Sequence, residues 1–143
     1  MTSFEDDYKE LLKSELKDEF SPTVLEHALN PKNRGKMEKA DSYARVTGPC
    51  GDTMEIWLKV ENGKITHATF ETDGCFTTIA AGSIATELVR DKELNGALQI
   101  DAQTILQALD CLPEESKHCA LLAANTLKGA LVYLLLNGRL NTQ

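Results

Sequence analysis

Residues 52–73 read DTMEIWLKVENGKITHATFETD, and they carry the strongest signal for the fold of this chain. Apolar and polar side chains alternate from Met54 to Val60, which is the period-two pattern of a half-buried strand. Asn62-Gly63 then supplies two residues that tolerate positive φ, the strongest short signal for a β-hairpin. The stretch therefore predicts an antiparallel pair in which residues 64–72 return beside the first strand.

The sequence on both sides of the hairpin predicts an α+β domain. Residues 44–47 are expected to add a third, shorter strand. Helical spacing and capping signals, such as Ser21-Pro22 before one segment, predict five helices. They cover residues 4–16, 23–29, about 76–90 and 101–109, and a last helix from Pro113 or Ser116 to Leu136 with Gly138 as its stop.

The last helix is expected to bury one apolar face, made of Leu121, Ala124, Leu127, Leu131 and Leu134. We thus predict a three-stranded antiparallel sheet packed against several helices. Residues 1–19 form an acidic, helical extension in this interpretation, and residues 20–143 form the domain.

The composition of the chain argues against several classes of function. The 143 residues carry 22 acidic against 15 basic side chains, a net charge of -7, which argues against nucleic acid or an anionic membrane as partner. We find no apolar run of the roughly 18 residues that span a membrane and no secretory or transit signal, so we predict a cytoplasmic protein. In a reducing compartment, four cysteines bind metal, transfer sulfur or pack in the core more often than they form disulfides.

Two cysteines flank the hairpin. Cys50 lies in Gly48-Pro49-Cys50-Gly51-Asp52, where a soft thiolate and a harder carboxylate can share one metal, although a structural turn with a buried cysteine fits equally well. Cys75 follows the second strand and begins a helix, whose N-terminal dipole should lower the thiol pKa. Pairing through the hairpin turn brings both cysteines to the same end of the sheet.

His118 and Cys119 are adjacent near the start of the last helix. Neighbouring helix positions diverge by about 100°, so either one of the two side chains ligates while the other does not, or the two alternate if the start of the helix shifts. Packing is the alternative for this pair, and it is the favoured interpretation of Cys111. Trp57 is expected either on a partner surface or buried under a helix.

The blocks Gly48-Pro49-Cys50-Gly51-Asp52, Asp73-Gly74-Cys75 and Leu112-Pro113 with His118-Cys119 resemble the signature blocks of the IscU/NifU N-terminal-domain family of iron-sulfur cluster assembly scaffolds. The resemblance covers about residues 20–136 and includes residues 21–35. It implies a scaffold, not an enzyme, that accepts sulfur from a cysteine desulfurase, binds iron, builds a [2Fe-2S] cluster and passes it to acceptor or carrier proteins. The implied ligands of the cluster or metal are Cys50, Asp52, Cys75, His118 and Cys119, with Cys119 also the persulfide acceptor.

The resemblance also implies zinc in the same site, and a frataxin-like protein, a ferredoxin or an Hsp70-type chaperone as further partners. The chaperone-recognised Leu-Pro-Pro-Val-Lys stretch is not matched, because Leu112-Pro113 is followed by Glu114-Glu115-Ser116. An alternative is the SufU-type relative, a zinc-dependent sulfurtransferase partner of a desulfurase. Those proteins carry an insertion between the second and third cysteines, whereas this chain has the short spacing from Cys75 to Cys119.

Overall fold

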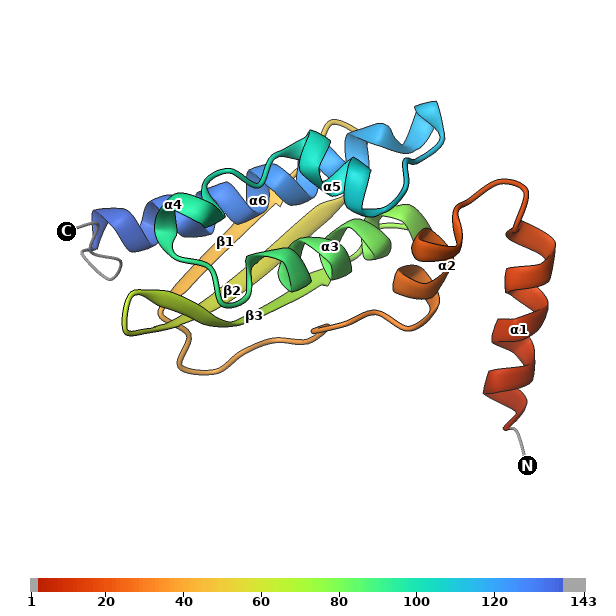
Figure 1. Ribbon diagram of the computed structural model, residues 1–143, viewed down its shortest axis with the longest axis horizontal. Coiled ribbons are helices and arrows are strands. Elements are labelled where there is room, and N and C mark those ends of the chain that lie inside the picture. Colours follow the sequence, from red (N-terminus) through yellow and green to blue (C-terminus); the bar gives the residue numbers. More distant parts are fainter. Residues whose placement is uncertain (1–2, 138–143) are drawn as a thin grey trace.

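A computed structural model describes residues 3–137 and shows a three-stranded antiparallel sheet in the order β1-β2-β3 (Figure 1). The strands are β1 (Ser42–Thr47), β2 (Thr53–Glu61) and β3 (Lys64–Thr72). The α+β prediction and the hairpin are confirmed. β1 begins at Ser42 instead of Ala44, because the buried Ser42 hydroxyl donates to the Ala130 carbonyl of the last helix and extends the strand.

The hairpin turn has the backbone that its sequence predicts. Asn62 and Gly63 have φ values of 54° and 77°, as the tight turns that suit twisted strands require. The register shifts between Lys59 and Val60, where β3 carries one extra residue and forms a bulge. Ile56 pairs with Phe70, and both side chains are fully buried on the inner face of the sheet.

Helices cover one face of this sheet. Figure 1 shows α3 (Phe76–Val89) and α6 (Lys117–Leu136) running along it, with α4 and α5 beside them. The helices α2, α3, α5 and α6 are those that the sequence predicts, whereas the four-residue α4 was not predicted. The remaining bounds are Pro22–Leu29 for α2, Leu94–Ala97 for α4, Ala102–Ala108 for α5 and Glu114–Ser116 for a 3₁₀ turn before α6. The predicted helix stop at Gly138 lies outside the described residues.

The buried face of α6 is wider than the predicted stripe. Leu127, Leu131 and Leu134 are buried as expected, but the expectation for Leu121 is wrong, because its side chain is 49% exposed. α6 contacts β1 and β2 on one side and α3 and α5 on others, so Leu122 and Ala123 face the core in place of Leu121. A helix enclosed on several sides does not follow a single 3.6-residue stripe.

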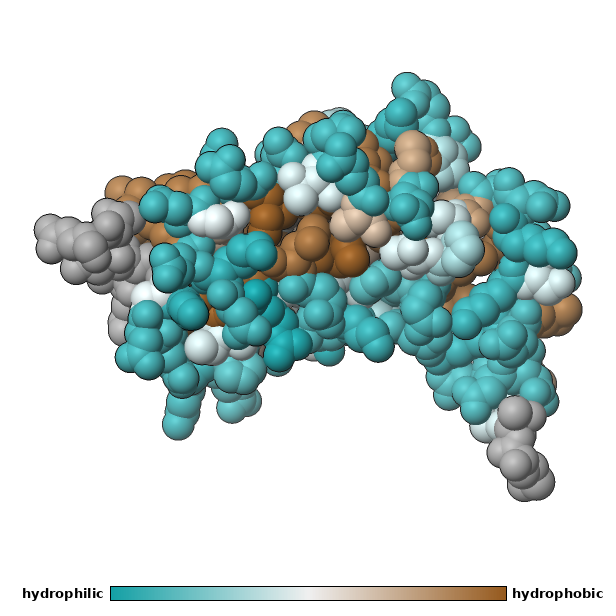
Figure 2. Space-filling view, in the orientation of Figure 1, coloured by the Kyte–Doolittle hydropathy of each residue, from teal (hydrophilic) through white to brown (hydrophobic). Residues whose placement is uncertain are grey.

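α6 is also the most apolar helix. Residues 114–136 are long and apolar enough to cross a membrane by length and composition, but 56% of the most apolar window is buried inside the protein. Figure 2 shows hydrophobic surface along this edge of the molecule. Its exposed apolar residues include Val132, Tyr133 and Leu135. We interpret the helix as a core helix because of its packing against the sheet.

The predicted N-terminal helix forms as α1 (Phe4–Leu16) and projects from one end of the molecule (Figure 1). No residue of α1 is buried, and Phe4 is 86% exposed. Polar contacts join it to α2: the Lys9 Nζ donates to Asn30 Oδ1 at 2.9 Å, and Lys13 Nζ lies 3.2 Å from Glu26 Oε1. Leu12 and Leu16 are half-buried. The extension is therefore attached to the domain without entering its core.

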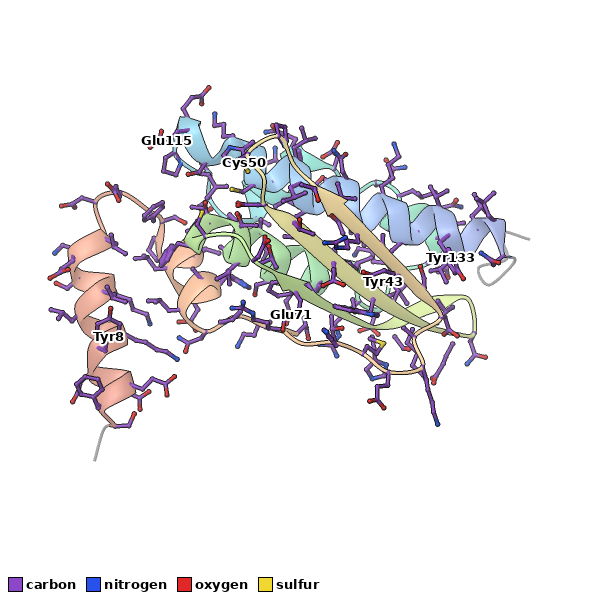
Figure 3. All side chains as sticks on the ribbon, turned by 180° about the vertical axis from the view of Figure 1, so that it is seen from behind. Tyr8, Tyr43, Cys50, Glu71, Glu115 and Tyr133 are labelled. Carbon is purple, nitrogen blue, oxygen red and sulfur yellow. The ribbon has the colours of Figure 1, made fainter. Side chains whose placement is uncertain are left out.

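The face of the sheet turned away from the helices carries Trp57. Figure 3 shows this face in front of the helices, with Tyr43 on it. Trp57 is only 9% exposed, and its ring centroid lies 5.3 Å from that of Tyr43, its partner across β1 and β2. Both expectations for Trp57 are wrong: the ring is too buried for an open partner surface, and it lies on the face opposite Ile56, where α3 and α6 do not pack.

Candidate metal centre

The hairpin brings the two predicted ligand turns to one end of the sheet. The Thr72 hydroxyl donates to the Thr53 carbonyl at 2.6 Å, and the Thr53 N–H donates to Asp73 Oδ1 at 2.8 Å. These bonds join the start of β2, just after Asp52, to the end of β3, just before Cys75. The predicted meeting of the two turns is confirmed by this geometry.

Cys75 is the residue at which α3 begins. It has extended backbone angles as the N-cap, and its side chain is exposed. The sulfur lies 3.5 Å from the Thr77 hydroxyl oxygen and 3.8 Å from that of Thr78. Burial alone would raise the pKa of the Cys75 thiol, but hydrogen bonding by these hydroxyls and the backbone N–H groups of Thr77 and Thr78 lowers it overall.

Cys119 reaches the same two hydroxyls from α6. Its sulfur lies 3.3 Å from the Thr77 oxygen and 3.2 Å from the Thr78 oxygen, but the residue is only 1% exposed. Burial raises the pKa of Cys119, and the hydroxyls only partly oppose that rise. Nearby negative charge on Cys75 and Cys50 raises it further.

Asp52 belongs to the same group through Thr78, whose hydroxyl donates to Asp52 Oδ2 at 3.0 Å. The carboxylate also lies against the Gly74 backbone, where an added Cβ would be 2.8 Å from Oδ2 and 2.7 Å from Thr78 Cβ. A side chain at position 74 would therefore displace both groups. The short Asp-Gly-Cys sequence thus leaves room for a carboxylate next to a thiol.

Cys50 and His118 lie at the edge of this group. Cys50 is exposed on the glycine-flanked turn (Figure 3), near enough for its charge to act on Cys119. His118 is exposed, and its Nε2 lies 3.7 Å from the Cys119 sulfur. In residues 3–137 no three His, Cys, Asp or Glu side chains are already arranged to hold a metal ion. The five-residue centre remains a prediction, and the structure joins Asp52, Cys75 and Cys119 through hydroxyl groups.

The other candidate residues lie elsewhere or in other contacts. Cys111 is exposed at the end of α5, so the expectation that it packs in the core is wrong. Both Asp110 and Cys111 have positive φ values, 59° and 76°, which turn the chain sharply after α5 and leave the Cys111 side chain exposed. His27 is half-buried, with Nδ1 2.7 Å from the Ser83 hydroxyl, and burial lowers its pKa.

Sequence reasoning missed Thr77 and Thr78, although each contacts both sulfurs. Both are buried in the first turn of α3. The available signal was their position two and three residues after a cysteine at a helix start, where hydroxyl and N–H groups face the N-cap side chain. Threonine in a first turn is too common for that signal to stand alone.

The comparison with protein families agrees with this architecture. The model of the NifU-like N-terminal domain matches residues 19–136. The chain belongs to this family. Its relatives include the iron-sulfur cluster assembly scaffold protein IscU 1 of Archaeoglobus fulgidus, 40% identical over 85% of this chain and 81% of that protein. The IscU scaffold of Haemophilus influenzae is 39% identical over 78% of this chain and 92% of its own length.

A solved structure has the same fold as this chain. A crystal structure described as a putative iron-sulfur cluster assembly scaffold protein for the SUF system, from Fervidobacterium islandicum, superimposes with a TM-score of 0.64. The alignment covers 78% of this chain and 96% of that chain at 21% identity. At this identity the likeness supports the IscU/SufU-like fold alone.

Proposed function

We propose that this protein is an iron-sulfur cluster assembly scaffold, which accepts sulfur and iron as cargo, builds a [2Fe-2S] cluster and transfers it to acceptor proteins. The observation that carries the proposal is the meeting of Asp52, Cys75 and Cys119 at one sheet end in a chain of this family. Thiolates suit an iron-sulfur cluster, and a carboxylate gives a harder and more exchangeable ligand than a fourth thiolate. Such a centre can release its cargo.

The sulfur step needs one nucleophilic thiolate. A scaffold thiolate attacks the outer sulfur of a desulfurase persulfide, a new S–S bond forms, and the donor's S–S bond breaks, so the donor cysteine leaves as a thiolate. No net oxidation occurs in this transfer. Each transferred sulfur then takes two electrons to become sulfide, and a ferredoxin partner or a thiol reductant supplies them.

Two cysteines are candidates for that nucleophile. The family resemblance assigns the role to Cys119, but Cys119 is buried with a raised pKa, whereas Cys75 is exposed with a lowered pKa. In the described conformation Cys75 is therefore the better first nucleophile. Cys119 becomes the acceptor if partner binding exposes it.

The remaining parts of the proposal concern partners and surroundings. Cys50 and His118 complete the ligand set from the rim, and zinc occupies the site when iron is scarce, since thiolate, imidazole and carboxylate all bind it. The partners are a cysteine desulfurase and cluster acceptors or carriers, acting in the cytoplasm. A frataxin-like protein or an Hsp70-type chaperone is a further candidate.

The decisive experiment is anaerobic reconstitution with a cysteine desulfurase, L-cysteine, ferrous iron and a reductant. We expect the visible absorption of a [2Fe-2S] cluster, and its loss in the Cys75→Ser and Cys119→Ser variants. Cys111→Ser is the matched control, because Cys111 is an exposed thiol outside the group. Retention of zinc without cluster absorption would contradict the scaffold proposal and favour the zinc-dependent sulfurtransferase.

Asp52→Ala tests the labile ligand separately. A reconstituted cluster should then persist longer in the presence of an acceptor protein, because its exchangeable ligand has been removed. The decay of visible absorption measures this lifetime. An unchanged lifetime would remove Asp52 from the release step while leaving the assembly role intact.

A further inference from the structure

We infer that Ser21 is a positioning residue whose hydrogen bond to the Leu109 carbonyl, the latch, keeps Cys119 buried. The inference deepens the proposed function, on which it rests, because it states what must open before sulfur can reach Cys119. The hydrogen bonds of the Ser21 side chain go to Val24 and Leu109, so Ser21 acts through the segment that leads into α6.

The Ser21 hydroxyl makes two hydrogen bonds at the start of α2. Its oxygen accepts from the Val24 N–H at 3.1 Å, which caps the helix, and it donates to the Leu109 carbonyl at 2.5 Å. Leu109 is the C-cap of α5 and is fully buried. The last carbonyls of a helix have no partner within that helix, so they depend on donors from elsewhere. Ser21 supplies such a donor from 88 positions away in the sequence.

The chain is strained directly after the Leu109 carbonyl. Asp110 and Cys111 form a corner in which both residues have left-handed backbones, with φ values of 59° and 76°. Such conformations cost energy and persist only where the surrounding structure holds them. A second bond from α2, which Thr23 Oγ1 donates to Asp110 Oδ2 at 3.1 Å, acts on the same corner. The first turn of α2 therefore holds a corner that would otherwise relax.

The corner sets the position of the start of α6. Leu112, the next residue along the chain, is 4% exposed and belongs to the same buried cluster as Cys119. The 3₁₀ turn then leads into α6, whose first turn contains Cys119 and whose side packs against α5. When the corner relaxes, the start of α6 moves away from α3 and the Cys119 sulfur becomes accessible.

The residue before the latch contacts the other helix that begins at a cysteine. The ring centroids of Phe20 and Phe76 lie 5.3 Å apart, and Phe76 directly follows Cys75. Residues 20–23 thus touch the start of α3 and the end of α5 at once. The latch therefore lies at the same end of the sheet as the cysteines that it influences.

The test is the rate at which iodoacetamide labels Cys119 in the metal-free protein, measured at one pH by peptide mass spectrometry. Urea is added at concentrations well below the unfolding transition. Labelling through a local opening changes little with urea, because little surface is exposed, whereas labelling through global unfolding rises steeply. We expect a rate that does not depend on urea in the wild-type protein.

Two substitutions of Ser21 remove the latch. The Cys119 rate should rise at least about fivefold in Ser21→Ala and Ser21→Asp, because the closed form loses a hydrogen bond that the open form has already broken. Aspartate still caps α2 but has no proton to donate, so Ser21→Asp separates the latch from the cap. Ser21→Thr keeps both hydrogen bonds and should behave as wild type. Thr23→Val, which removes the bond to Asp110, should act in the same direction and replaces Ser21→Ala if that variant does not fold.

Ser42 offers a matched control for Ser21. Its buried hydroxyl donates to the Ala130 carbonyl at 2.5 Å, also across 88 positions, but in the C-terminal half of α6. Ser42→Ala should lower the free energy of unfolding in urea, measured by circular dichroism, without raising the urea-independent labelling of Cys119. A merely structural role of Ser21 would give this same result.

Metal binding and sulfur transfer supply two further readouts for Ser21→Asp. Thiolate-to-cobalt absorption gives the affinity for cobalt(II), which should stay within about twofold of wild type because the closed form still dominates the population. In the desulfurase reaction, mass spectrometry should find a larger share of the persulfide on Cys119 relative to Cys75. An unchanged share would overturn the link between the latch and sulfur delivery.

Four other results would overturn the inference. They are an unchanged Cys119 rate in Ser21→Asp and Ser21→Ala, an equal increase in Ser42→Ala, a steep dependence on urea in wild type, and a large loss of cobalt affinity in Ser21→Asp. Failure of cluster assembly in the reconstitution experiment would instead remove the proposed function. It would leave the labelling rates, which need neither iron nor a desulfurase, as they are.

Discussion

The start of α3 and the start of α6 each present a cysteine to the same two threonine hydroxyls, with opposite results. Cys75, at the helix N-terminus and exposed, has a lowered thiol pKa, whereas Cys119, only 1% exposed, has a raised one. The threonine hydroxyls are shared, so they alone do not explain the difference. Solvent access and the backbone N–H groups around Cys75 decide it.

This difference suggests a division of labour within one small site. An exposed thiolate suits capture of an incoming sulfur atom, whereas a buried thiol resists oxidation and solvent until it is used. Under the proposed function, the two thiols hold the same cargo without being equally reactive. Four measurements, in decreasing order of expected effect, test whether the two thiols differ in this way.

The largest effect concerns alkylation in the metal-free protein. At neutral pH, iodoacetamide should modify Cys75 at least about tenfold faster than Cys119, since each unit of pKa separation changes the thiolate fraction tenfold and burial adds to it. Peptide mass spectrometry over time gives both rates, with exposed Cys111 as internal reference. Equal rates in the folded protein would contradict the comparison.

A smaller effect is expected from Thr77→Val. Loss of its hydroxyl removes one of the interactions that lower the pKa of Cys75, so that pKa should rise and alkylation at neutral pH should slow severalfold. The pH dependence of the Cys75 alkylation rate measures the change directly. Thr77→Ser is the control, and a rate unaffected by the valine substitution would place the cause in the helix N-terminus alone.

The next effect is on the pH dependence of stability. Cys119 has a raised pKa in the folded protein, so above about pH 8.5, the ordinary thiol pKa, the unfolded chain holds fewer protons and stability falls. Cys75 has a lowered pKa, so stability rises with pH from its folded pKa up to about 8.5.

Urea unfolding between pH 7 and 10 separates the two contributions. Cys119→Ser should flatten the decline above about pH 8.5, and Cys75→Ser should remove the rise below it. Identical profiles for the two variants would mean that the thiols do not differ in the folded state.

The smallest effect is expected at Cys111. Cys111→Ser should change the unfolding free energy by less than about 0.5 kcal/mol, because the side chain is exposed and its sulfur donates a hydrogen bond to the neighbouring Leu112 carbonyl, which a serine hydroxyl can also do. Cobalt affinity should also stay at the wild-type value. A large change in the unfolding free energy or in the cobalt affinity would mean that Cys111, like Cys75 and Cys119, contributes to the site or to stability.

Much of the fold was predictable because its signals are local. The Asn62-Gly63 turn and the alternating pattern locate β2 and β3, and Ser21-Pro22 marks the start of α2. The failures depend on tertiary contacts: Ser42 joins β1 through the Ala130 carbonyl, and Leu121 is exposed because α6 is packed on several sides. A four-residue helix such as α4 carries no detectable periodicity.

The sequence yields candidate ligand residues but not their environment. Sequence spacing and the hairpin explain why Asp52 and Cys75 meet, while Cys119 comes from a helix 42 positions beyond Thr77, at a contact that no local pattern encodes. The hydroxyl contacts of Thr77 and Thr78 with both sulfurs could not be predicted for the same reason. The burial of Cys119, which makes its thiol pKa differ from that of Cys75, also depends on tertiary packing.

The buried Trp57 ring, on the sheet face opposite α3 and α6, has a practical consequence. Trp57 is the only tryptophan in the chain, and it is packed beside Tyr43 across the β1–β2 pair. Its fluorescence therefore reports whether the β1–β2 pair is intact. The absorption of a cobalt(II) ion bound by thiolates at the end of the sheet reports metal binding instead. One sample thus yields two optical signals that distinguish a variant with an altered site from one with a damaged sheet.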